Sequence, residues 1–238
     1  MSRTETISTA HAREGSPASA GAARGRRECL AVVLVAAAVL LPRLGARSLA
    51  DWDEAIYAQV AREMLERGDF LVPHHGGSPF FEKPPLYFWF TVGCYFVAGV
   101  TELGARLGSA LSGIGVAAVV ASLGFALGGR WVGTVAPVVL LTSAGFVLSS
   151  RSGMLDVPLT LATWLAVVAF LRFRSGSPRH AYLVAVAAAA AVMLKSVAGL
   201  IAPAGLALAL WLDPDGRDQR RSAALRRAAA LGLALAAP

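Results

Sequence analysis

The sequence predicts an all-α protein that crosses a membrane several times, as a polytopic bundle of transmembrane helices. The 238 residues are 56% hydrophobic and only 16% charged, whereas soluble domains carry about 25% charged residues. The charges collect in short blocks between long stretches rich in Ala, Val, Leu and Gly. Basic clusters also flank several of these stretches. All three observations are typical of membrane-spanning helices.

The chain divides into a polar tail and an apolar module. Residues 1–27 are rich in Ser, Ala, Gly and Arg without apolar periodicity, which predicts a disordered tail. Residues 28–238 form the predicted transmembrane module. Its apolar segments lie at about 28–45, 85–101, 106–128, 131–149, 157–172, 181–194, 197–212 and 228–238. The first segment is interpreted as an uncleaved span. Because the sequence ends inside the last apolar segment, we expect the module to be truncated.

Arginine clusters predict the orientation. They occur in the tail, at 172–180 and at 213–227, and basic clusters next to spans mark cytoplasmic segments. The N-terminus is therefore predicted to be cytoplasmic, and residues 44–84 form the first outer loop. The same clusters explain the net charge of +7. Because no aromatic–basic surface accompanies them, we expect no nucleic-acid partner.

The number of crossings predicts where the bundle is irregular. Between the outer loop and residues 172–180 the chain must cross an odd number of times, yet four apolar segments lie there. Region 131–155 is predicted to be the incomplete crossing, because it contains a polar cluster. Irregular backbone at membrane depth needs shielding by protein or by a water-filled cavity, so a cavity is predicted near residues 149–156. A second turn is predicted near Lys195.

The outer loop is predicted to contain an amphipathic helix that begins at Asp53. Ile56, Val60 and Met64 recur every four residues and polar residues occupy the other faces. Asp53 is the predicted N-cap and Gly68 the predicted stop. A helix of about 14 residues is too short to span, so it should lie along the membrane surface.

Two polar groups at the outer edge of apolar segments could carry chemistry. The pair Asp53 and Glu54 could supply a general base or a metal ligand, or could cap a helix within a solvated charge cluster. Lys83, which follows Glu82 and precedes two prolines, could contact a lipid phosphate or anchor the next helix at the interface.

Two further groups lie within apolar regions. Arg151 and Asp156 are functional candidates because ionisable residues are costly there, although they could also pair with each other. Lys195 is either a further site residue or an anchor. No P-loop, dinucleotide fingerprint or HExxH motif occurs. No metal site or cofactor is predicted with certainty, and a divalent cation at the acidic pair stays open.

In order along the chain, these motifs resemble those of the GT-C glycosyltransferases. The resemblance is carried by DEAIYA at 53–58, REM at 62–64, GD at 68–69, VPH at 72–74 and FEKPP at 81–85. MLDVP at 154–158 resembles a second acidic motif of the superfamily. The stretch 193–203 resembles its K-G-x-x-x-x-x-P motif, with Ser196 in place of the usual glycine. The branch it resembles most comprises aminoarabinose-to-lipid-A transferases and bacterial homologues of protein O-mannosyltransferases.

The resemblance implies a GT-C-type bundle that transfers a sugar, hexose or pentose, from a polyprenyl-phosphate donor with inversion. The acceptor would be a lipid, glycan or protein on the outer face of the bacterial inner membrane. By motif position, Asp53 is the expected catalytic carboxylate, Lys83 contacts the donor phosphate, and Asp156 is the second acidic residue. We expect further residues at the site, namely Glu54 for catalysis and Glu82, Arg151, Lys195 and Tyr57 for substrate binding.

Two other functions stay open at this point. A membrane transporter or flippase would also have broken helices and charges within the membrane, although the half repeat typical of one is not found in this sequence. A catalytically inert, truncated membrane subunit is the other alternative.

The predicted orientation can be tested by thiol labelling after Cys29 and Cys94 are replaced by serine. Ser78→Cys should react with a membrane-impermeant thiol reagent added to intact cells, because residue 78 lies in the predicted outer loop. Ser222→Cys should react only after the membrane is opened, because it lies in a predicted cytoplasmic arginine cluster. The extent of labelling is measured by mass spectrometry, and the reverse pattern would contradict the orientation.

Overall fold

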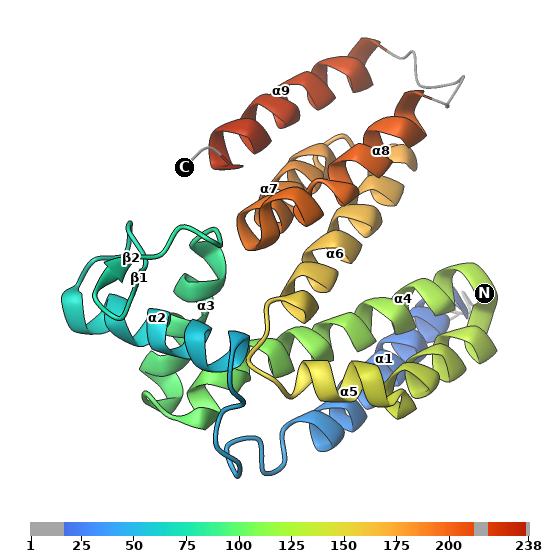
Figure 1. Cartoon of the computed structure of the whole chain (residues 1–238). Coiled ribbons are helices and arrows are strands. Elements are labelled where there is room, and N and C mark those ends of the chain that lie inside the picture. The colour runs from blue at the N-terminus through green and yellow to red at the C-terminus, as the bar shows by residue number, and fades with distance from the viewer. Residues whose placement is uncertain (1–16, 212–218, 237–238) are drawn as a thin grey trace, which may run out of the picture.

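The computed structural model describes residues 17–211 and 219–236, and this part of the chain is almost entirely helical (Figure 1). The predicted all-α class is therefore confirmed. The elements are α1 (Pro17–Leu40), α2 (Asp53–Arg67), β1 (His74–His75), β2 (Ser78–Pro79), α3 (Leu86–Ala98), α4 (Glu102–Thr142), α5 (Ala144–Ser150), α6 (Asp156–Arg174), α7 (His180–Gly199), α8 (Ile201–Trp211) and α9 (Gln219–Ala236).

The start of α1 differs from the predicted tail. The helix begins at Pro17, inside the stretch 1–27 that was predicted to be disordered. Proline is favoured at the first helical position, and the alanines that follow are strong helix formers. The rest of the predicted tail, residues 1–16, lies outside the described residues, as do residues 212–218 of the second predicted cytoplasmic loop.

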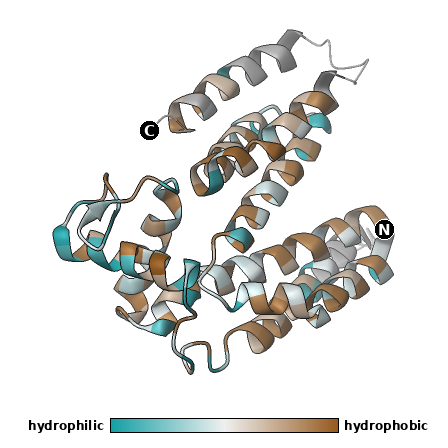
Figure 2. Cartoon of the chain, viewed as in Figure 1, coloured by the Kyte–Doolittle hydropathy of each residue, from teal (hydrophilic) through white to brown (hydrophobic). Residues whose placement is uncertain are grey.

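Three of the described helices, α4, α6 and α7, are long and apolar enough to cross a membrane. Figure 2 shows hydrophobic residues along most of these helices, whereas hydrophilic residues gather around α2 and the β-hairpin. The protein is therefore an integral membrane protein. The apolar part of α1 begins only at Cys29 and the helix ends at Leu40, so α1 is not among these three helices. That the first predicted span crosses the membrane fully therefore stays a prediction.

Helix α4 is a hairpin of two antiparallel halves. Its backbone breaks at Gly129, where φ is 70° and ψ −163°, a conformation that is essentially restricted to glycine. The halves meet so closely that a Cβ on Gly124 would lie 2.7 Å from the Gly133 Cα atom. Helix α5 continues the second half, because a Cβ on Gly113 would lie 2.8 Å from Cβ of Ser150.

This hairpin corrects the predicted position of the incomplete crossing. Residues 130–150 return along the first half of α4 (Figure 1), so the prediction that 131–155 is incomplete is wrong. The short segment is α3, whose 13 residues extend only about 20 Å at 1.5 Å per residue, less than the roughly 30 Å of a bilayer core. Three crossings then remain between the outer loop and residues 172–180, namely 102–128, 130–150 and α6. Three is the odd number that the predicted orientation requires.

The predicted turn at Lys195 is confirmed. Lys195 and Ser196 have non-helical backbone angles inside α7, and the chain then folds back onto the same helix. The contact is close enough that a Cβ on Gly199 would collide with the carbonyl oxygen of Ala191. The break places the Lys195 side chain at an end of the helix rather than along its side.

The outer loop folds as the predicted amphipathic helix followed by a small hairpin. Helix α2 is followed by the C-cap residue Gly68, whose φ of 69° is the left-handed conformation of a helix stop. The predicted cap at Asp53 is wrong, because Trp52 occupies the N-cap position and no side chain caps the helix. The Glu63 carboxylate accepts hydrogen bonds from the Gly76 and Gly77 amides at 2.8 and 3.2 Å, which ties the turn between β1 and β2 to α2.

A core of large side chains joins α2 to α3 and to the start of α6. Tyr57, Tyr87, Phe88, Met64 and Leu155 are each no more than 2% exposed. The Tyr57 ring meets Tyr87 and Phe88 edge-on at centroid distances of 5.6 and 6.0 Å, a favourable geometry for aromatic pairs. This packing fixes α2 against the membrane helices at the end of the bundle where the predicted site residues lie.

Candidate active site

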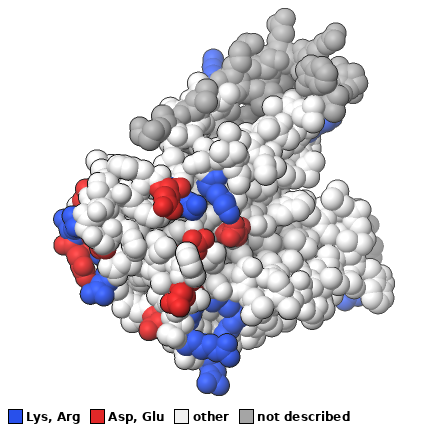
Figure 3. Space-filling view, in the orientation of Figure 1, with Lys and Arg blue, Asp and Glu red and all other residues white. Residues whose placement is uncertain are grey.

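Four segments that are distant in sequence contribute charged residues at one end of the bundle. Asp53 begins α2, Glu82 and Lys83 precede α3, Asp156 begins α6, and Lys195 lies at the break in α7. Figure 3 shows acidic and basic side chains gathered at this end, while most of the visible surface elsewhere is uncharged. The structure thus brings together most of the residues predicted for the site.

Glu54 joins the segments that surround this site. Its carboxylate accepts hydrogen bonds from the Ala50 amide at 2.7 Å and the Gly153 amide at 2.7 Å. It also accepts two from Arg106, from Nε at 2.8 Å and from NH2 at 3.0 Å. Because the acceptor positions are filled by the protein, and the residue is only 4% exposed, this geometry favours a positioning role for Glu54.

The surroundings of Glu54 keep it ionised. Burial alone would raise its pKa, but the hydrogen bonds from Arg106, Ala50 and Gly153, together with the Arg106 charge, lower the pKa below its ordinary value. The carboxylate therefore carries a negative charge at neutral pH and forms a buried ion pair with a guanidinium that is 6% exposed.

Arg106 fastens the outer loop to α4. Besides Glu54, its guanidinium donates to the carbonyls of Leu44 at 3.1 Å, Arg47 at 2.8 Å and Ser48 at 2.8 Å. These contacts use all five N–H donors of an arginine. The loop 44–48, α2 and the segment before α6 are therefore all anchored through one buried ion pair.

The Tyr57 hydroxyl lies in the field of three carboxylates. Burial, then the negative charge of Asp53 and a hydrogen bond to its carboxylate, and last the charges of Asp156 and Glu82 raise the pKa of Tyr57 above its ordinary value. The phenol stays protonated and can act as a hydrogen-bond donor. Tyr57 is therefore linked electrostatically to acidic residues from three segments of the chain.

The basic members of the site lie beside this acidic group. Lys195 Nζ donates to Oδ1 of Asp156 at 2.7 Å, and both side chains remain partly exposed. Glu82, Lys83 and Lys195 also line one cavity of about 450 Å³. Two lysine side chains therefore border a space large enough for a small anionic group.

Arg151 does not join this cluster. Its guanidinium donates to the carbonyls of Val39 at 3.2 Å, Leu40 at 2.7 Å and Pro42 at 2.8 Å, so it covers the C-terminal end of α1. The alternative that Arg151 pairs with Asp156 is therefore wrong. The cavity predicted near residues 149–156 is present, since Arg151 and Ser152 line a space of about 550 Å³.

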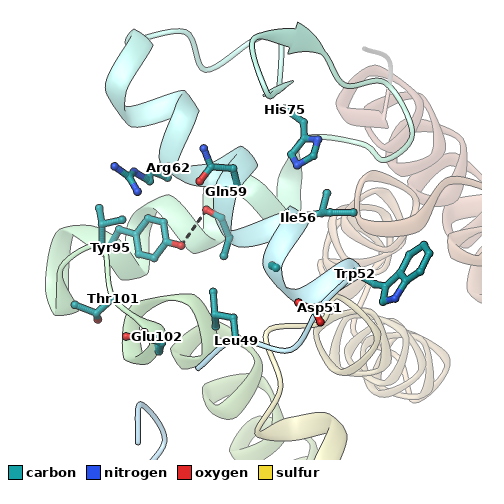
Figure 4. Close-up of a pocket in the computed structure, with 13 residues that line it drawn as sticks. Leu49, Asp51, Trp52, Ile56, Gln59, Arg62, His75, Tyr95, Thr101 and Glu102 are labelled. Atoms are coloured by element: carbon teal, nitrogen blue, oxygen red, sulfur yellow. Dashed lines mark hydrogen bonds between the residues drawn. The ribbon is translucent and has the colours of Figure 1, made fainter. Parts of the chain in front are cut away.

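A larger hollow of about 820 Å³ lies on another face of α2. Figure 4 shows Ile56, Gln59 and Arg62 along that face of the helix, with Tyr95 donating a hydrogen bond to the Ala58 carbonyl at 3.0 Å. Asp51 lines this hollow, whereas Asp53, Lys83 and Asp156 do not. It is therefore distinct from the charged cluster.

Two residues that position the site were missed by sequence reasoning. Arg106 lies at the start of an apolar segment, and the rule for ionisable residues in such segments would have found it. Ser109 carried no such signal: its hydroxyl donates to the Met154 carbonyl at 2.6 Å and accepts from the Met154 amide at 3.2 Å. In residues 17–211 and 219–236, no three His, Cys, Asp or Glu side chains group as metal ligands.

The fold and the site together define a class of protein: a helical integral membrane protein with a charged cluster at one end of its spans. Residues 27–223 match the family described as dolichyl-phosphate-mannose-protein mannosyltransferase. The chain therefore belongs to this family. The resemblance to the GT-C superfamily is confirmed.

Relatives with known names fall in the same group. An undecaprenyl phosphate-alpha-4-amino-4-deoxy-L-arabinose arabinosyl transferase of Pseudomonas savastanoi pv. phaseolicola is 38% identical over 138 residues, which are 56% of this chain and 25% of the relative. The apo crystal structure of ArnT from Cupriavidus metallidurans aligns with a TM-score of 0.71 and 28% identity over 91% of this chain. The structure of that protein bound to undecaprenyl phosphate aligns with a TM-score of 0.72, 23% identity and 87% coverage.

The chain spans 41% of each ArnT chain. The similarity thus covers most of this chain but less than half of the solved relative.

The Glu54–Arg106 pair predicts a pH-dependent stability. Glu54→Gln removes the charge and leaves Arg106 buried without its partner, so we expect the unfolding free energy at pH 7 to fall by about 3–5 kcal/mol. Because the folded-state pKa of Glu54 is lowered, the wild-type advantage should be complete above about pH 5 and shrink as the pH falls below about 4.5. The measurement is detergent-solubilised unfolding of both proteins between pH 3 and 7.

Glu66→Gln is the matched control, because it makes the same change in the same helix. Glu66 pairs with Arg62 at 2.7 Å, but both side chains are more than half exposed, so the cost should stay below about 1 kcal/mol. Equal costs for the two variants would show that Glu54 has no special structural role.

Proposed function

We propose that this chain is the membrane-embedded catalytic part of a glycosyltransferase that moves a sugar from a polyprenyl-phosphate donor to an acceptor. The observation that carries the proposal is the convergence of three carboxylates and two lysines at one end of the bundle in a member of this family. The names of the relatives given above include undecaprenyl phosphate or an undecaprenyl-phosphate sugar.

Asp53 is the proposed general base. It begins α2 without capping the helix and its side chain is exposed, so its oxygens are accessible to a substrate. The carboxylate takes the proton of the acceptor hydroxyl while the acceptor oxygen bonds to the anomeric carbon of the sugar. The bond from that carbon to the phosphate oxygen breaks, and the lipid phosphate leaves with the electron pair. One displacement of this kind inverts the anomeric centre.

Lys83 and Lys195 are the proposed cations for the phosphate. Both line the cavity of about 450 Å³ beside the acidic cluster, and ammonium groups stabilise the negative charge that develops on a departing phosphate. Lys195 is held by Asp156, which gives Asp156 a role in orienting a cation. Glu82, also on this cavity, and the Tyr57 hydroxyl are suited to hydrogen bonding with sugar hydroxyls.

Glu54 and Arg151 have supporting roles in this proposal. Glu54 sets the position of Asp53 by anchoring the start of α2 to Arg106 and Gly153, and Arg151 holds the end of α1. The isoprenoid part of the donor would remain in the bilayer next to the apolar helix surfaces.

The arginine clusters support an orientation with the N-terminus in the cytoplasm and the site at the outer face of a bacterial inner membrane. The acceptor is a lipid, glycan or protein that presents a hydroxyl or comparable nucleophile there. The transporter alternative has no counterpart among the relatives named above, which are an arabinosyl transferase and ArnT.

Substitutions of Asp53 and Lys83 in the full-length protein test the proposal. Asp53→Asn keeps the size of the side chain but cannot take the acceptor proton, so sugar transfer should fall by about 10²-fold or more with donor affinity little changed. Lys83→Ala removes a charged contact to phosphate, so donor affinity should weaken together with the rate. Transfer is measured with a radiolabelled lipid-phosphate sugar, and donor affinity by equilibrium binding.

Thermal unfolding of the same variants provides the control. Asp53 makes no capping hydrogen bond, so Asp53→Asn should unfold close to the wild-type temperature. Near-normal transfer by this variant would exclude Asp53 as the base.

A further inference from the structure

Four arginines line the cavity of about 550 Å³ at the end of α1. It lies between the loop that follows α1, the start of α2 and the end of α5, and its basic residues are Arg43, Arg47, Arg106 and Arg151. None of its lining residues belongs to the cavity bordered by Lys83 and Lys195. Figure 3 shows a basic patch over this part of the molecule.

The cavity carries an uncompensated positive charge. Glu54 is the acidic residue that lines it, and its charge is balanced by the buried Arg106. Arg106 has no donor left for a ligand, since all five of its N–H groups are bonded to the protein. Three positive charges therefore remain, on Arg43, Arg47 and Arg151.

These three guanidinium groups have unused hydrogen-bond donors. The side chains of Arg43 and Arg47 are exposed, and within the described ranges they make no hydrogen bond or ion pair. Arg151 bonds three carbonyl oxygens through its two terminal nitrogens, which leaves Nε–H and one terminal N–H of its five donors. Because the α1 carbonyls hold Arg151 in place, part of the donor set is already oriented.

A phosphate group is the ligand that this donor set fits. Guanidinium groups bind phosphate oxygens through paired N–H donors, and a phosphate offers more acceptor oxygens to several arginines around one space than a carboxylate does. The cavity lies where α1 ends, which in the proposed topology is close to the level of the lipid headgroups. In the proposed orientation these arginines also lie on the outer side, where basic residues next to spans are unusual, so a bound anion accounts for them.

We propose that this cavity is a second anion site that binds the phosphate of an anionic membrane-lipid headgroup. The lipid would clamp the loop after α1 to the end of α5, and this loop is the segment that Arg106 holds through the Leu44, Arg47 and Ser48 carbonyls. Occupancy would thereby stabilise the entry to α2. The site does not depend on the proposed sugar transfer, because it uses neither Lys83 nor Asp53.

Lipid titration of the purified full-length protein tests this site. In detergent, phosphatidic acid binding is followed by native mass spectrometry for the wild type, for Arg43→Gln/Arg47→Gln and for Arg26→Gln/Arg27→Gln. The second pair is the matched control, because it removes two exposed arginines in the first half of α1 that do not line the cavity. We expect affinity to fall by about tenfold or more in the first double variant and to stay within about twofold in the control.

Further measurements distinguish a lipid phosphate from free phosphate, and specific binding from nonspecific attraction. Inorganic phosphate at millimolar concentration should not displace the lipid, and displacement at equal affinity would assign the site to free phosphate and overturn the lipid proposal. Equal losses of lipid affinity in both double variants would show nonspecific attraction. No loss of affinity in either variant would exclude the cavity as the lipid site. No sugar donor is present, so the result is independent of catalysis, and wild-type unfolding temperatures for both variants exclude misfolding as the cause.

Discussion

One buried ion pair organises the outer end of this molecule. Glu54 and Arg106 lie 52 residues apart and are each less than a tenth exposed, yet together they bind the loop after α1, the start of α2, the body of α4 and the segment before α6. A buried pair gains little stability over a well-packed apolar pair, so its value here is geometric. It fixes where Asp53 begins α2 relative to Asp156 at the start of α6, and both act on the Tyr57 hydroxyl.

The irregular backbone around this pair explains why it is needed. Helices satisfy their own backbone groups, but the irregular segments 41–52 and 151–155 must find partners elsewhere. Arg106 supplies donors to three carbonyls of the first segment, Arg151 covers the end of α1, and Glu54 and Ser109 bond the amides of Gly153 and Met154. Buried charges are thus used where the chain leaves helical structure. The more exposed charges on Asp53, Lys83, Asp156 and Lys195 are the ones proposed for chemistry, and those on Arg43 and Arg47 are the ones proposed to bind a lipid.

Local patterns predicted much of this arrangement. The four-residue periodicity of Ile56, Val60 and Met64 and the stop at Gly68 located α2, and the shortness of the apolar segments located the turn at Lys195. The cap at Asp53 and the incomplete crossing at 131–155 were wrong, because both depend on tertiary contacts. Trp52 takes the cap position in a segment where the Ala50 amide bonds Glu54 instead, and the hairpin at Gly129 depends on close packing of two glycine-lined helices. The partner of Glu54 could not be predicted, because no local pattern pairs residues so far apart.

A double-mutant cycle on Glu54 and Arg106 tests the organising role of this pair most directly. The unfolding free energies of the wild type, Glu54→Ala, Arg106→Ala and the double variant are measured in the same detergent at pH 7. If the two side chains form the buried pair described here, each single variant leaves an unpaired charge. The loss of unfolding free energy in the double variant should then be smaller than the sum of the two single losses by about 2–3 kcal/mol. Losses that add within about 0.5 kcal/mol would contradict the account.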